Sequence, residues 1–283
     1  MAVFRRGMHF GSYSFADDPA EVWRRLGDAV RAAEQAGFDF VSVPDHLAQN
    51  QVGGGPLAPM FEAYSLLGSL AVMTERVKLA ALVSPVTFRS PALLAKAVCT
   101  LDVASGGRAV LGVGAGWDQS EHEAYGIPFP PVRERMDRLD ETLSVCRAMF
   151  SERRSSFSGS RYTLTDAPSS PQPLSGHLPI LVGGGGERRT LRLAARHADI
   201  CNVSGDAQTV RHKLEVLEAH CAAVGRDPKE LTRTVFTLTR DPDTAAEGLS
   251  ALAEVGVDGV VVLGSADTAV IERWARLLGQ TFR

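Results

Sequence analysis

The chain has 283 residues, of which 45% are hydrophobic, and its 30 basic and 33 acidic side chains give a net charge of −3. This balance excludes the strongly basic surface with which proteins bind nucleic acid. No apolar stretch approaches the roughly 18 uncharged residues of a membrane span, and the N-terminus lacks a hydrophobic signal core. The four cysteines have no metal-binding spacing. We therefore expect a cytoplasmic protein with buried thiols, no metal site and no membrane partner.

Short apolar runs alternate along the chain with segments of helical periodicity. The predicted strands lie at residues 8–14, 38–43, 77–83, 109–113, 178–182, 199–203, 231–239 and 257–263. The predicted helices lie at residues 19–36, 60–73, 92–103, 132–150, 187–197, 208–224, 244–255 and 266–278. Eight strand–helix units predict an α/β fold, a single (β/α)8 TIM barrel over residues 1–283.

Residues 151–178 are rich in Ser, Pro and Gly, and we expect them to form an insertion after the fourth strand and helix. A doubly wound sheet is the alternative fold. It requires a reversal of strand order and usually has fewer strands, so the barrel is favoured.

The fourth predicted strand opens into a loop with chemically active side chains. The strand is apolar and ends in Gly112, Gly114 and Gly116. Reactive side chains follow at Trp117, Asp118, Glu121, His122, Glu123 and Tyr125. The carboxyl ends of barrel strands carry active sites, so this loop is a candidate site. The glycines do not form a dinucleotide fingerprint, because position 117 is Trp and three strand–helix units precede them.

A second candidate is the Asp45–His46 pair at the end of the second predicted strand. Histidine titrates near neutrality, so His46 is suited to transferring a proton. A structural or surface role is equally compatible with the pattern. Glu121 and His122 could likewise face only solvent, and we interpret His9 as structural or surface.

Four consecutive glycines separate the fifth strand from its helix: Gly183, Gly184, Gly185 and Gly186. Free N–H groups at a helix N-terminus form a phosphate site, and Arg188 and Arg189 would face the anion. The alternative is a tight turn that needs small residues for packing. Four glycines exceed that need, so we favour phosphate.

Several segments, taken together and in order, resemble the bacterial luciferase-like monooxygenase superfamily, and most closely its coenzyme F420-dependent oxidoreductases. The segments are Val43–His46, Leu82–Pro91, Leu101–Asp102 with Ser105–Arg108, Leu111–Trp117 and Pro179–Gly186. The resemblance runs from about residue 8 to 263. It implies a TIM barrel with a deazaflavin or a flavin over its C-terminal mouth, and homodimers are common among its members.

The resemblance also implies roles for individual residues. Asp45 and His46 would lie beside the reactive ring of F420. A bulge at Leu82, Val83 and Ser84, often with a non-prolyl cis peptide, would support the ring from behind. Gly114 would line the ring site, the glycine loop would hold the phosphate, and Asn202 and Ser204 would lie nearby.

One position departs from the pattern of the F420-dependent sugar-phosphate and alcohol dehydrogenases that this superfamily contains. In those enzymes a proton-donating Glu follows the glycine loop, whereas this chain has Trp117. This argues against a sugar phosphate or a simple alcohol as the substrate. It favours an apolar or planar substrate stacked on Trp117, with His46 or Glu121 handling the proton.

We therefore expect an enzyme that transfers a hydride between the C5 atom of F420 and a small molecule. The loops 47–58 and 114–131 and the insertion 151–178 would close over the substrate. Two alternatives stay open: an FMNH2-dependent monooxygenase that uses O2, and a non-catalytic flavin-binding barrel.

Overall fold

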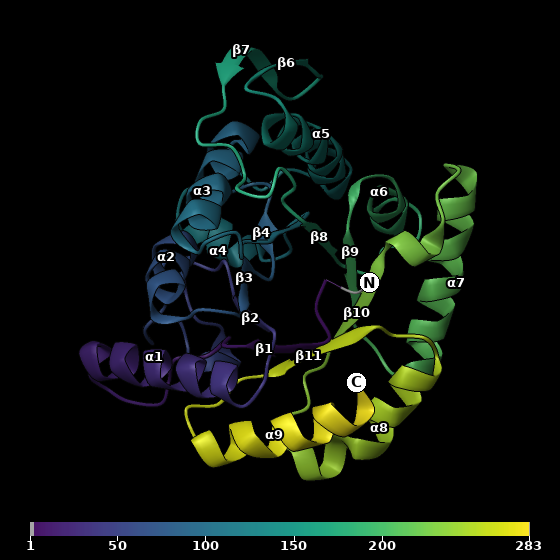
Figure 1. Cartoon of the computed structure of the whole chain (residues 1–283). Helices are drawn as coiled ribbons and strands as arrows, with labels where there is room; N and C mark the ends of the chain where they lie inside the picture. The colour runs from purple at the N-terminus through teal and green to yellow at the C-terminus, as the bar shows by residue number, and fades with distance from the viewer. Residues whose placement is uncertain (1–2, 283) are drawn as a thin grey trace.

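The computed structural model describes residues 3–282, and parallel strands and helices alternate along most of this range (Figure 1). The strands are β1 (Arg6–His9), β2 (Phe40–Val43), β3 (Lys78–Ala81), β4 (Ser84–Pro85), β5 (Leu111–Gly114), β6 (Arg154–Ser158), β7 (Thr163–Pro168), β8 (Ile180–Gly183), β9 (Ile200–Val203), β10 (Thr232–Phe236) and β11 (Gly259–Leu263). The helices are α1 (Pro19–Gln35), α2 (Ala63–Met73), α3 (Pro91–Ala104), α4 (Gln119–Ala124), α5 (Val132–Ser151), α6 (Thr190–His197), α7 (Ala207–Ala223), α8 (Pro242–Glu254) and α9 (Thr268–Thr281), with short 3-10 turns at Gln51–Gly53 and Pro228–Glu230.

The main sheet curls into a barrel. Its strand order is β3-β2-β1-β11-β10-β9-β8-β5-β4, and every pairing is parallel. A parallel bridge between Leu79 and Ala109 joins β3 to the residues before β5 and closes the ring. The predicted TIM barrel is confirmed. Parallel strands put all their carboxyl ends at one mouth, where the following loops meet.

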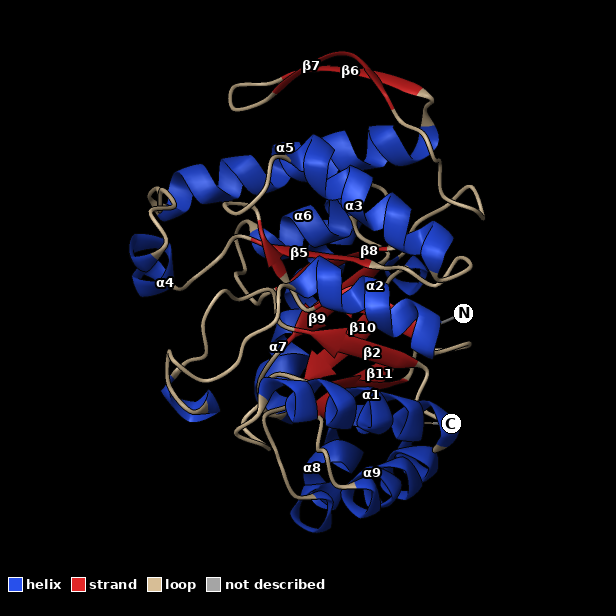
Figure 2. Cartoon of the chain, turned by 90° about the vertical axis from the view of Figure 1, so that its left-hand side faces the viewer, coloured by secondary structure: helices blue, strands red, loops and turns tan. Residues whose placement is uncertain are grey.

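Apolar side chains pack in two layers around this sheet. The inner layer fills the barrel with Phe4, Phe40, Ala80, Val110, Leu181, Ile200 and Val261. The larger outer layer lies between the sheet and the surrounding helices. In Figure 2, α4 lies at the end of the molecule opposite to the two termini, because it follows the carboxyl end of β5. The layers fix the strand ends on which the site depends.

The third barrel strand is interrupted where the sequence predicted one continuous strand over residues 77–83. Strand β3 ends at Ala81, a non-prolyl cis peptide joins Leu82 to Val83, and β4 then pairs with β5. A Cβ atom on Gly114 would lie 2.7 Å from Val83 Cγ2, and one on Gly183 would lie 2.8 Å from Val83 Cγ1. The two glycines therefore leave room for the Val83 side chain.

The insertion at residues 151–178 forms an antiparallel hairpin of β6 and β7 that packs beside α5, at the top of Figure 1. It follows the fourth helix of the barrel, as predicted. Among the described residues, we find no helix that is both long and apolar enough to cross a membrane.

Some predicted boundaries are wrong. The first strand, predicted at residues 8–14, ends at His9, because the alternation continues into loop residues Phe10 and Tyr13, which are buried in the core. The helix predicted to begin at Glu187 begins at Thr190, after a turn. The glycine run is therefore separated from the helix N-terminus.

Candidate active site

A cavity of about 850 Å³ opens at the mouth of the barrel. Its walls come from the carboxyl ends of the barrel strands and from the loops that follow them. The predicted site residues that line it are Asp45, His46, Leu82, Val83, Gly114, Trp117, Glu121, Gly183, Gly184, Gly185, Gly186, Asn202 and Ser204. This volume suits a cofactor-sized ligand.

Two of the three segments expected to close over the substrate contribute to this cavity. Asn50 and Gly53 come from loop 47–58, and several lining residues come from loop 114–131. None of the lining residues comes from 151–178, because the hairpin packs on the outer side of α5. The expectation that this insertion covers the substrate is therefore corrected.

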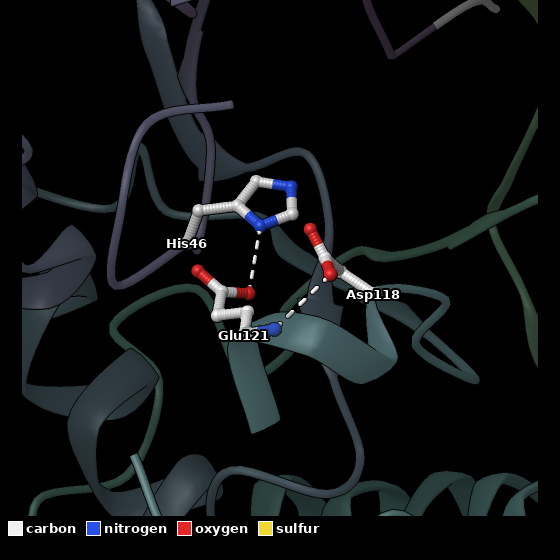
Figure 3. A group of neighbouring side chains, drawn as sticks. All are labelled: His46, Asp118 and Glu121. Carbon is white, nitrogen blue, oxygen red and sulfur yellow. Dashed lines mark hydrogen bonds and ion pairs between the residues drawn. The ribbon is translucent and has the colours of Figure 1, made fainter. Parts of the chain in front are cut away.

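His46 and Glu121 form the most reactive pair of the site (Figure 3). The Nδ1 atom of His46 lies 2.9 Å from Glu121 Oε2, and the other carboxylate oxygen accepts the N–H groups of Leu47 and Ala48. Because the ionised carboxylate of Glu121 can only accept hydrogen bonds, His46 carries a proton on Nδ1 and donates it to this bond. Atom Nε2 points away from Glu121 and is the atom that can exchange a proton with a ligand.

Helix α4 holds Glu121 in this position. Asp118 caps the helix by accepting the N–H of Glu121 at 3.1 Å, and it also accepts the Ser120 hydroxyl. This cap fixes the first turn of the helix, from which Glu121 reaches His46. The side chain of Glu121 is 4% exposed and that of His46 is 27% exposed.

The charges around His46 favour its protonated form. Burial alone lowers the pKa of His46, but the hydrogen bond and charge of Glu121, with Asp118 and Asp45, raise that pKa above its ordinary value of 6.5. Burial likewise raises the pKa of Glu121, but His46 and the N–H groups of Leu47 and Ala48 bring it below its ordinary value. The pairing therefore favours the protonated form of His46 and the ionised form of Glu121.

His46, Asp118 and Glu121 each place one potential ligand atom within 4.8 Å of the others. Both oxygens of Glu121 already accept hydrogen bonds, and His46 Nδ1 is shared with one of them. The donor set is therefore committed to internal bonds and fits a proton-holding group better than a metal centre.

Asp45 belongs to a different cluster below the cavity. Its carboxylate accepts Arg89 Nη1 at 2.6 Å, and the same guanidinium contacts Glu62. Burial raises the pKa of Asp45 above its ordinary value, although the charge of Arg89 opposes that rise. Asp45 lines the cavity but already has a cation as its partner.

Ser84 and Arg188 are the two predicted cofactor-binding residues that do not line the cavity. Ser84 is fully buried, and its hydroxyl lies 2.9 Å from the Tyr64 hydroxyl. Arg188 is exposed to solvent. Arg189, also expected to face an anion, instead donates to Asp137 at 2.6 Å. The two arginines lie outside the cavity because they belong to the turn before α6, whereas Ser84 is buried against Tyr64.

The glycines of the loop have different reasons for lacking a side chain. Gly183 makes room for Val83, and Gly184 has a φ of +117°, which favours glycine. A Cβ atom on Gly185 would lie at an ordinary 3.6 Å from Lys213 Cε. Within residues 3–282, the N–H groups of Gly185 and Gly186 make no hydrogen bond. They fit the phosphate of a cofactor.

Trp117 and His122 complete the description of the predicted loop. Trp117 is 67% exposed and meets the His46 ring edge-on, with the centroids 5.5 Å apart. His122 is buried, and both its nitrogens are bonded, to Thr87 and to the carbonyl of Asp118. Both residues line the cavity, but His122 has no free nitrogen, whereas Trp117 offers an exposed ring to a ligand.

Residues 3–276 match the model of a family described as luciferase-like monooxygenase. The chain belongs to this family. Curated relatives of this luciferase-like chain include oxidoreductases whose names state different cofactors. The F420-dependent glucose-6-phosphate dehydrogenase of Kineococcus radiotolerans is 34% identical over 79% of this chain and 66% of its own length. The FMNH(2)-dependent dimethylsulfone monooxygenase of Pseudomonas putida is 29% identical over 80% and 60%.

Solved structures share the luciferase-like barrel. The coenzyme F420-dependent tetrahydromethanopterin reductase of Methanopyrus kandleri has a TM-score of 0.81, covers 99% of both chains and is 18% identical. This likeness concerns the fold. The family match and the curated relatives support an oxidoreductase of the luciferase-like family.

Sequence reasoning missed three residues of this luciferase-like site. His9 lines the cavity, and burial, with the charge of His46, lowers its pKa to about 3, so it is a neutral group. Arg240 follows β10 and also lines the cavity. Lys213 on α7 lies beside Gly185. The rule that site residues follow the carboxyl ends of barrel strands could have found His9 and Arg240. Lys213 is placed near the site only by the packing of α7.

Proposed function

We propose that the protein is a coenzyme F420-dependent oxidoreductase that transfers a hydride between the deazaflavin C5 and a C=C, C=N or C=O bond of a small organic substrate. The observation that carries this proposal is the open Nε2 atom of His46, held by Glu121 at the wall of a cofactor-sized cavity. When bound, the deazaflavin supplies or receives the hydride. The protein has to position both molecules, exclude water and move one proton.

The residues present fit such a cofactor at two places. Leu82, Val83 and Gly114 give the cavity an apolar wall at the interrupted strand, where a planar ring can lie. The N–H groups of Gly185 and Gly186 offer donors to a phosphate, and Lys213, which pairs with Glu187, lies nearby. Asn202, at the end of β9 next to the strand that carries the glycine loop, is held by a 2.9 Å hydrogen bond to Thr234 and lines the cavity.

The proton is handled by His46. In the reducing direction, Nε2–H of the imidazolium donates to the substrate atom that needs a proton, and Glu121 stabilises the charge before transfer. In the oxidising direction, the neutral Nε2 accepts the proton, and Glu121 stabilises the cation that forms. His9 stays neutral throughout, since its pKa of about 3 is far below neutrality.

A second candidate is an FMNH2-dependent monooxygenase that uses O2. The dimethylsulfone monooxygenase relative supports it, and an apolar wall with a phosphate loop suits FMN as well. Trp117 favours an apolar substrate in either case. It argues against the sugar phosphate named for the Kineococcus relative, because the resemblance places a proton-donating Glu at this position.

A titration with F420 and with FMN, followed by the fluorescence of each ring, tests the proposal. We expect F420 to bind at micromolar concentration or below and FMN to bind much more weakly. The reverse preference would overturn the proposal and favour the monooxygenase. Binding of neither would overturn both.

The phosphate loop has its own control. Gly185→Asp puts a carboxylate beside the free N–H groups and should weaken binding of the preferred cofactor by about tenfold or more. Arg188→Gln lowers the net charge by the same one unit outside the cavity and should have little effect. Equal effects of the two variants would remove the phosphate from this loop.

A further inference from the structure

The charged side chains that line the cavity differ in whether they have a partner. Asp45 pairs with Arg89, Glu121 pairs with His46, and Asp118 caps α4. Arg240 differs from them, because it makes no hydrogen bond and no ion pair with any residue between 3 and 282. It is exposed and follows β10 at the cavity wall. A guanidinium in this position is a ready donor for an anion.

Large apolar side chains stand exposed at the same cavity. Leu238, two residues before Arg240, is 72% exposed. Trp117 and Val132, on the loop and helix that follow β5, are 67% and 62% exposed. All three line the cavity, so they form an apolar rim rather than scattered surface residues. An apolar rim of this kind is typical of a ligand site.

The cation and the phosphate loop lie at separate strand ends. Arg240 follows β10 and the glycine loop follows β8, with β9 between them. Neighbouring strands are about 4.8 Å apart, so the strand ends are separated by roughly 10 Å. Arg240 and the glycine loop therefore belong to different parts of the cavity wall.

We infer that the substrate of the proposed reaction has an apolar, planar body, packed against Trp117 and Leu238, and an anionic group such as a carboxylate, bound by Arg240. This inference rests on the proposed function and names its substrate class. The guanidinium supplies two parallel N–H donors to a carboxylate, and the apolar rim removes water from the planar body. The substrate then extends from Arg240 toward the proton-carrying Nε2 of His46.

The test uses a matched pair of probes, 2-naphthoate and 2-naphthamide, which share a planar body and differ in charge. Calorimetric titrations are done with and without F420. We expect naphthoate to bind about tenfold more tightly than naphthamide. Arg240→Gln should abolish this difference by weakening only naphthoate. Leu238→Ala should weaken both probes to the same extent.

Arg153→Gln is the control, because Arg153 is an exposed arginine next to the β6–β7 hairpin, away from the cavity. Its titrations should match those of the unmodified protein. Equal binding of the two probes, or a preference that survives Arg240→Gln, overturns the inference.

The cofactor titration separates the two sources of negative charge. Arg240→Gln should leave the dissociation constant of F420 unchanged. If it weakens F420 about tenfold and leaves the probe ratio intact, Arg240 serves the cofactor tail and the inference is wrong. If F420 does not bind the unmodified protein, the proposed function fails, while the titrations without F420 still decide the role of Arg240.

Discussion

Asp45 and His46 are adjacent in the sequence, yet they belong to clusters of opposite character. Asp45 is buried with Arg89, and that guanidinium also contacts Glu62 and lies 4.8 Å from the centre of the Tyr64 ring. His46 is partly exposed, bonded on one nitrogen and open on the other. A cluster with every group satisfied holds the loop in place, whereas a cluster with one open atom can react.

The largest effect is expected when the imidazole that carries the open Nε2 atom is removed. His46→Ala should lower kcat/KM by about 10²–10⁴-fold, because the proton then has no carrier, while cofactor binding is retained. The assay follows oxidation of the reduced cofactor with a panel of unsaturated and imine compounds. His177→Ala, at an exposed histidine away from the cavity, is the control. Full activity of His46→Ala would favour the non-catalytic alternative.

Loss of an ion pair in the cluster of Asp45, Arg89 and Glu62 should instead lower the stability of the fold. Asp45→Ala leaves the Arg89 guanidinium without its buried partner and should lower the free energy of unfolding by about 3 kcal/mol. Urea denaturation measures this change. The exposed pair of Arg154 and Asp166 provides the control, since Asp166→Asn should cost less than about 1 kcal/mol. Similar losses in the two variants would show that the burial of Asp45 does not matter.

The pH dependence sharpens the contrast further. Glu121 raises the pKa of His46 above 6.5, so donation from Nε2 persists above that pH and is lost as pH rises through the raised pKa. Their pairing stabilises the fold over the same range and is lost in the same direction. In Glu121→Gln, no carboxylate at this position opposes the effect of burial, so the pKa of His46 falls. The alkaline limb of the rate profile should therefore move to lower pH.

The profile of kcat/KM against pH, or the NMR titration of His46, measures this shift. Glu123→Gln is the control, because Glu123 lies exposed on the same helix and contacts Gln119. A limb that stays in place in Glu121→Gln would mean that His46 is not the group that titrates.

The smallest expected effect belongs to Glu62. Its side chain is 44% exposed, and Arg89 keeps Asp45 as a partner when Glu62 is neutral. Glu62→Gln should therefore change the free energy of unfolding by less than about 1 kcal/mol in urea denaturation. A loss as large as that of Asp45→Ala would show that the three groups stabilise the fold only as a unit.

The order of strands and helices could be predicted from the sequence because each element carries its own periodicity. Boundaries failed where loops are also buried or apolar. The predicted strand 231–239 ends at Phe236, and its last residues form the loop with exposed Leu238. The strand predicted at residues 77–83 ends at Ala81, because no apolar pattern marks the cis peptide at Leu82 and Val83; only the family resemblance implied this bulge.

The site was predictable only in part. The strand-end rule pointed to His46 and to the glycine loop. The bond between His46 and Glu121 joins residues 75 apart, and the ion pair of Asp45 joins residues 44 apart. Closure of the barrel makes both contacts, so no local signal could assign Glu121 to His46 or Arg89 to Asp45. Arg188 was predicted to bind the cofactor, but it lies in a turn that the pattern did not predict and does not line the cavity.

The carboxylate of Glu121 links the position of the loop after β2 to the pKa of His46. Glu121 accepts both the ring of His46 and the N–H groups of Leu47 and Ala48, and the Tyr125 hydroxyl donates to the carbonyl of Leu47 at 2.8 Å. If the chain after β2 swings outward, the imidazole loses its anion in the same movement. Its acid strength then returns toward that of a free histidine. The raised pKa of His46 therefore depends on the position of the loop after β2.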